Sequence, residues 1–172
     1  MTSLFEIVFE NIERKFVPAV ISKFIGCADE VVSIQTDHQT PYFSKNSPDK
    51  FTNKLIESDK YSYALLTLKN MRVGKYLLSL VGLRMIKYEN LFDVDVNFDF
   101  DTEDKREISL IIKSWHEYSI NLSKEFDIKF FFGGMEPASD KDTRYFSNEK
   151  AGPCHWTCGW LSFGEEAVDE FI

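Results

Sequence analysis

The sequence feature that most constrains the fold is a strict alternation of apolar and polar residues over 92–101. The apolar set is Phe92, Val94, Val96, Phe98 and Phe100, and the polar set is Asp93, Asp95, Asn97, Asp99 and Asp101. Successive side chains of a β-strand point to opposite faces, so this pattern places the apolar set on one face of a sheet and the acids on the other. The stretch therefore predicts a strand that is buried on one side only.

Helical and strand-like patterns flank this stretch. Apolar residues recur at helical spacing over 3–16, and a short second turn after Pro18 carries Val20, Ile21 and Phe24 inward. A helix over 47–59 is predicted from its Ser-Pro start. A long helix is predicted over 102–124, with these residues inward: Ile108, Ile111, Ile112, Trp115 and Leu122. Further strands are predicted at 31–34, 61–69, 75–85, 128–132 and 155–163. The segment 75–85 also fits a helix, but Gly82 and its position between strands favour β. Residues 133–153 are predicted as a long loop or a short irregular hairpin.

This order predicts an α+β fold with a mostly antiparallel sheet and helices packed on one side. A chain of 172 residues fits a single domain over 1–172. The 16 Phe, 7 Tyr and 3 Trp are enough for a core that needs no metal or disulfide.

The charge balance limits the class of partner. The chain has 28 acidic and 20 basic residues, a formal charge of −8. Binding to nucleic acid requires a clustered basic surface, and binding to anionic lipid has the same requirement, so neither partner is expected. A basic protein surface suits this charge better.

Cysteine usage and the absence of a long apolar segment predict a cytoplasmic protein. The three cysteines, Cys27, Cys154 and Cys158, leave one thiol over in any pairing, as expected in a reducing compartment. The first residues lack the basic and apolar regions of a signal peptide, and the longest apolar stretch, 76–83, is too short to span a bilayer.

The acids of the alternating stretch are the first candidate site. Alternate residues of a strand lie about 7 Å apart, so Asp93, Asp95, Asp99 and Asp101 would form a carboxylate row, which Glu103 and Asp104 extend. A cationic partner would relieve the repulsion within this row. The alternative is an ordinary solvated sheet face with lysines of neighbouring strands opposite the acids.

Catalytic alternatives have less support in the sequence. A metal-dependent hydrolase or nuclease could use clustered carboxylates, but its acids must converge from several elements. Structural zinc requires four ligands, but the Cys154-His155-Trp156-Thr157-Cys158 segment supplies only one Cys pair, and His38, His116 and Cys27 are scattered along the chain; we expect the two cysteines to pack as small apolar side chains. A small-molecule-binding module would use Trp115, Trp156 and Trp160 to line a pocket. The sequence predicts no catalytic residue, no metal and no cofactor.

Residues 131–138, Phe-Phe-Gly-Gly-Met-Glu-Pro-Ala, continue with Asp140 and Asp142-Thr143-Arg144-Tyr145-Phe146. This segment resembles immunity proteins of bacterial polymorphic-toxin and contact-dependent inhibition systems. The resemblance extends over about 61–153, including the order of strands, the Phe/Asp stretch and the long helix.

The resemblance implies a small cytosolic protein that binds a toxin domain and occludes its active site or substrate path, without being an enzyme. Nuclease toxins tend to be basic, which agrees with the acidic charge of this chain. Two partner-binding regions follow, and the sequence leaves open which one forms the interface. They are the acids Asp93, Asp95, Asp99, Asp101, Glu103 and Asp104, and the loop residues Glu136, Asp140, Asp142, Arg144 and Tyr145. The acids of the loop could also simply cap turns, and the oligomeric state is open.

Overall fold

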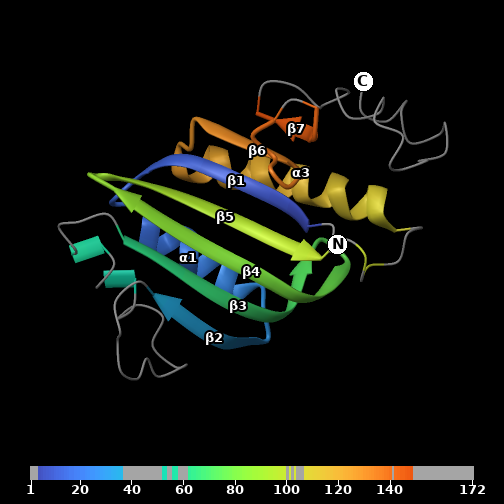
Figure 1. Cartoon of the computed structure of the whole chain (residues 1–172), viewed down its shortest axis with the longest axis horizontal. Helices are drawn as coiled ribbons and strands as arrows, with labels where there is room; N and C mark the ends of the chain where they lie inside the picture. Colours follow the sequence, from blue (N-terminus) through green and yellow to red (C-terminus); the bar gives the residue numbers. More distant parts are fainter. Residues whose placement is uncertain are drawn as a thin grey trace.

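The computed structural model describes residues 4–36, 52–53, 56–57, 62–99, 101, 103, 107–140 and 142–148. They form a seven-stranded sheet in the order β2-β3-β4-β5-β1-β6-β7, in which every neighbouring pair is antiparallel (Figure 1). The elements are β1 (Leu4–Glu13), α1 (Val17–Gly26), β2 (Glu30–Thr36), β3 (Ser62–Val73), β4 (Tyr76–Tyr88), β5 (Leu91–Asp99), α3 (Ile108–Phe126), β6 (Phe130–Met135) and β7 (Arg144–Ser147).

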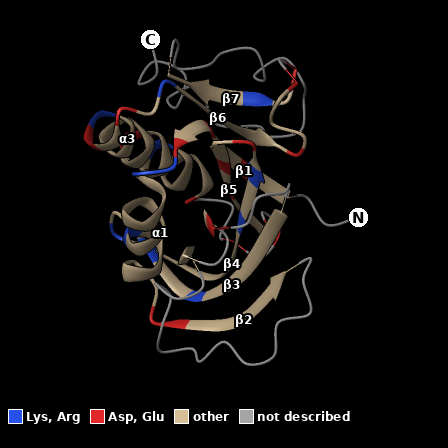
Figure 2. Cartoon of the chain, turned by 90° about the vertical axis from the view of Figure 1, so that its left-hand side faces the viewer, with Lys and Arg blue, Asp and Glu red and all other residues tan. Residues whose placement is uncertain are grey.

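Both α1 and α3 pack against the same face of the sheet (Figure 2). The α1 helix buries Val17, Val20, Ile21 and Phe24. The α3 helix buries Ile108, Ile111, Ile112, Trp115, Ser119, Leu122 and Phe126. The predicted α+β fold with helices on one side is confirmed, as are the predicted inward residues of both helices. The long helix begins at Ile108 rather than at residue 102.

The prediction of a helix over 3–16 is wrong, because residues 4–13 form β1, an interior strand of the sheet. Phe5, Ile7 and Phe9 alternate toward the core, and all are fully buried. The register against β5 then shifts between Phe9 and Ile12, where Asn11 adopts a φ of 58°. This β-bulge adds a residue and moves the next core position from 11 to 12. The apolar spacing thereby imitates that of a helix.

The other predicted strands are confirmed where the structure describes them. Residues 75–85, which also fitted a helix, lie in β4. The polar segment after β6 forms the hairpin β6–β7, so the hairpin alternative was correct. The predicted strand over 155–163 lies outside the described residues, and so do Cys154, Cys158, Trp156 and Trp160. Residues 52, 53, 56 and 57 of the predicted helix over 47–59 are helical.

Trp115 is a core residue and does not line a pocket. Its side chain has no exposed surface, stacks on Phe98 at 6.4 Å between ring centroids and meets Tyr118 edge-on at 5.7 Å. The hypothesis that Trp115 lines a ligand site is therefore wrong. None of the described helices is long and apolar enough to cross a membrane.

Candidate functional site

We call the face of the sheet that is turned away from α1 and α3 the polar face (Figure 2). In β5, Phe92, Val94, Val96 and Phe98 are buried in the core beneath the helices. Asp93, Asp95 and Asp99 alternate with them and therefore point to the polar face. The alternation predicted this division correctly, although Phe100 and Asp104 lie outside the described residues.

The exposed carboxylate row that we predicted is interrupted at Asp95, which is only 2% exposed. Arg84 of β4 lies directly opposite it in register. The Arg84 Nε donates to both carboxylate oxygens of Asp95, at 3.0 and 2.8 Å, and its Nη2 lies 2.7 Å from Oδ2. The prediction of a solvent-facing acid was wrong at this position, because the chain supplies its own cation from the neighbouring strand.

Burial and the ion pair act on Asp95 in opposite directions. Loss of solvent raises the pKa of Asp95 to about 6, although hydrogen bonding to Arg84 opposes that rise. Desolvation outweighs a good ion pair when a carboxylate is buried this deeply. On the arginine side, the hydrogen bond to Asp95 raises the pKa of Arg84. We therefore expect the Arg84–Asp95 pair to stay formed at neutral pH, and the burial of Asp95 to lower the free energy of unfolding.

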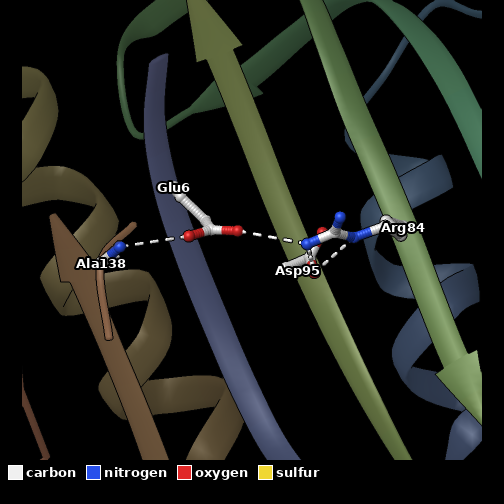
Figure 3. A network of polar contacts seen from close by, with 4 residues as sticks. All are labelled: Glu6, Arg84, Asp95 and Ala138. Carbon is white, nitrogen blue, oxygen red and sulfur yellow. Dashed lines mark hydrogen bonds and ion pairs between the residues drawn. The ribbon is translucent and has the colours of Figure 1, made fainter. Parts of the chain in front are cut away.

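Glu6 of β1 extends the Arg84–Asp95 pair toward the β6–β7 hairpin (Figure 3). Its Oε1 accepts from Arg84 Nη2 at 3.4 Å, and its Oε2 accepts the backbone N–H of Ala138 at 3.2 Å. Glu6 is 7% exposed. We missed this residue because its segment was predicted as a helix; alternation of Glu6 with Phe5 and Ile7 was the signal that could have revealed it.

Asp93 is also engaged by the protein's own donors. It accepts the backbone N–H of Asn11 at 2.9 Å and a short hydrogen bond from the Tyr88 hydroxyl. Burial raises the pKa of Tyr88, and the bond to Asp93 raises it further. Burial and the nearby charge of Asp93 together raise the pKa of Glu10. The inner half of the predicted row thus has structural partners on the polar face.

The outer half of the row meets the β6–β7 loop at one end of the sheet. Asp99 pairs with Leu4 at the start of β1, and the Leu4 carbonyl accepts the backbone N–H of Glu136 on the other side. The ends of β5 and β6 therefore flank β1, two strand spacings or roughly 10 Å apart. The structure thus places Asp99 and Glu136, one from each predicted region, on either side of Leu4 at one end of the sheet.

We use the name acidic end for the acids of these two segments: Asp99 at the end of β5, Asp101 and Glu103 after it, and Glu136, Asp140 and Asp142 in the β6–β7 loop. Asp101, Glu136, Asp140 and Asp142 are exposed, and Asp99 and Glu103 are half-buried. The backbone N–H of Asp101 donates to Asp99 Oδ1 at 2.9 Å, which fixes the turn after the strand.

Arg144 and Tyr145 have roles within the fold. The Arg144 guanidinium lies 4.7 Å from the centroid of the Phe132 ring and donates to the carbonyls of Ala138 and Ser139, at 3.2 and 2.6 Å. Tyr145 is buried and meets Phe5 edge-on at 5.5 Å. Tyr145 is thus not the exposed anchor that we expected, and Arg144 holds the loop.

Within the described ranges, no three or more His, Cys, Asp or Glu side chains are grouped so that they could hold a metal ion. Asp93 and Asp95 each face donors of the chain itself rather than a shared point. The arrangement therefore gives the metal-dependent hydrolase hypothesis no support.

Comparison with known proteins agrees with the resemblance seen in the sequence. The model of one family, described as PABL017 Cdi1I immunity protein, matches residues 3–151. No curated protein matches the chain. Among solved structures, a chain in the crystal structure of the toxic C-terminal tip of CdiA from Pseudomonas aeruginosa in complex with immune protein is similar in fold. The TM-score is 0.76 at 24% sequence identity, over 89% of this chain and 99% of that one. With a family model matched over nearly its whole length, the chain belongs to the PABL017 Cdi1I immunity protein family.

Proposed function

We propose that this immunity protein binds a cognate toxin domain in the cytosol and neutralises it by covering its active site, without catalysing a reaction. Membership of an immunity-protein family is the observation that carries the proposal. The similar solved structure supports it, because that structure contains a toxic tip of CdiA in complex with an immune protein.

The acidic end is the surface that we assign to toxin binding. It takes acids from both predicted regions and carries exposed carboxylates from two separate segments of the chain. A cationic surface on the toxin would complement these carboxylates in charge. The net charge of −8 would also steer a basic toxin toward the complex before contact.

In this proposal, the buried acids contribute to toxin binding only indirectly. Asp95 and Glu6 are nearly inaccessible, so a partner could not contact more than a small part of either carboxylate. Together with Arg84 they fix the strands that carry the acidic end. The partner contacts therefore fall to Asp99, Asp101, Glu103, Glu136, Asp140 and Asp142, and Asp104 stays a predicted contact.

Growth rescue and direct binding test the proposal. The C-terminal domain of the protein encoded directly upstream of this chain is expressed in cells with and without the chain, and the purified pair is then mixed in a calorimeter. We expect growth arrest by the toxin alone, rescue by the chain, and a dissociation constant in the nanomolar range, as is usual for specific inhibitor complexes. Arrest that the chain does not relieve, with no heat of binding, would refute the proposal.

A charge-matched pair of double variants locates the interface. Asp101→Asn/Glu136→Gln removes two charges from the acidic end, and Glu117→Gln/Glu125→Gln removes two from the exposed face of α3. The first should slow association with the toxin by several-fold at low salt and progressively less as salt screens the charges, since the Debye length is about 8 Å at physiological ionic strength. Equal slowing by the two variants would place the interface elsewhere.

A further inference from the structure

The loop between β6 and β7 is held against the sheet from two directions. From β1, Glu6 accepts the N–H of Ala138, and from β7, Arg144 donates to the carbonyls of Ala138 and Ser139. Ala138 itself has no exposed surface. A backbone segment whose donor and acceptors are all bonded in this way has little conformational freedom left to lose when it binds a partner.

Glu6 is an unusual residue for its position in the sheet. It lies between Phe5 and Ile7 in β1, next to Asn97 of β5 and Gly134 of β6 in register. A buried carboxylate is costly unless it is paired, and well-packed apolar residues often replace buried ion pairs without loss of stability. What an apolar side chain cannot do here is accept the Ala138 N–H.

Arg84 directs this carboxylate toward the loop. Asp95 binds both Nε and Nη2 of Arg84 (Figure 3). This fixes the position of Nη2, which also contacts Glu6 Oε1. The other oxygen, Oε2, is then aimed at Ala138. A chain of contacts thus runs from β5 and β4 through β1 to the loop that carries Glu136, Asp140 and Asp142.

We infer that Glu6 is a positioning residue for toxin binding, which fixes the loop of the acidic end in its binding conformation before the toxin arrives. The inference rests on the proposed function. It deepens that function by assigning a role to a residue that is itself almost inaccessible to a partner. Arg84 acts through Glu6, and the acids of the loop make the contacts.

Two substitutions of Glu6 separate positioning from charge. Glu6→Ala and Glu6→Gln remove the same negative charge, but only glutamine keeps an oxygen that can accept the Ala138 N–H, while Asp95 still holds Arg84. Loss of a hydrogen bond to a charged acceptor corresponds to an effect of about tenfold or more. We expect Glu6→Ala to dissociate from the toxin about tenfold faster, and Glu6→Gln to recover most of this loss.

Val20→Ala is the control for general destabilisation, because Val20 is fully buried in α1 on the opposite face of the sheet. It should lower stability and leave the toxin dissociation rate unchanged. Amide hydrogen exchange of Ala138 adds a measurement on the unaltered protein: the amide should be protected in the free state, and protected less in Glu6→Ala.

The outcomes distinguish this inference from the proposed function. Absence of binding by the unaltered protein would overturn the proposed function itself. Tight binding by the unaltered protein combined with unchanged dissociation of Glu6→Ala, or with an equal change in Val20→Ala, would overturn the positioning role alone. An Ala138 amide that exchanges freely in the free protein would also overturn it, even if no variant folds.

Discussion

At the scale of single residues, the partner of each acid decides what that acid can do. Asp93, Asp95 and Asp99 have the same place in the alternation, yet Asp95 is buried against Arg84, whereas Asp99 is half-buried at the end of its strand and accepts the backbone N–H of Asp101. The alternation predicts the face on which each acid lies. It does not predict Arg84 opposite Asp95, because strand register is a property of the pairing with β4 and not of β5 itself.

The raised pKa of Asp95 gives stability a defined pH dependence. A carboxyl whose pKa is about 6 in the folded state and about 4 in the unfolded state binds more protons when folded between these values. The free energy of unfolding should therefore fall as pH rises through this window. Relative to Asp95→Asn, the protein should lose roughly 1–3 kcal/mol between pH 4 and pH 7.

Urea unfolding of both proteins at several pH values checks this expectation. Glu117→Gln serves as the control, since its carboxyl is exposed on α3. Parallel pH profiles for the protein and Asp95→Asn would show that Arg84 compensates the burial fully.

At the scale of elements, the β6–β7 hairpin depends on glycines that let its strands approach closely. A Cβ at Gly134 would lie 2.3 Å from the carbonyl oxygen of Thr143, and one at Gly133 would lie 2.4 Å from the Phe146 ring. The sequence predicted a loop or hairpin here but not the close approach. Two adjacent glycines could equally have meant a flexible loop.

Gly134→Ala should destabilise the protein by about 1–3 kcal/mol, because a backbone atom cannot move aside as a flexible side chain can. The matched control is Gly26→Ala at the end of α1, where an added Cβ meets nothing within 4 Å. That change should be neutral or slightly stabilising. Thermal unfolding of both variants tests the pair, and equal melting temperatures would contradict the structural account.

At the scale of the whole molecule, β1 joins the two parts of the sheet. It pairs with β5 on one side and β6 on the other, and Phe5, Ile7 and Phe9 lie fully buried in the shared core. The fold class followed from the alternating stretch and the amphipathic pattern of residues 102–124. The interior position of β1 did not, since its bulge concealed the strand pattern and only long-range pairing reveals its neighbours.

If the chain is a single domain, a cavity in β1 should weaken all of it together. Ile7→Ala should lower the free energy of unfolding by about 2–4 kcal/mol. The loss of far-ultraviolet circular dichroism and the change in tryptophan fluorescence should still coincide in one urea transition. Separate transitions for the two signals would show that the parts on either side of β1 unfold independently.

The place of β1 also has a consequence for how the protein is made. This strand leaves the ribosome well before its partners β5 and β6, which end at Asp99 and Met135. Contacts that span such long stretches of chain form late and slowly. The nascent chain therefore cannot pair β1 with both partners until translation has passed Met135, so this part of the sheet closes only after the segments of α3 and β6 have been made.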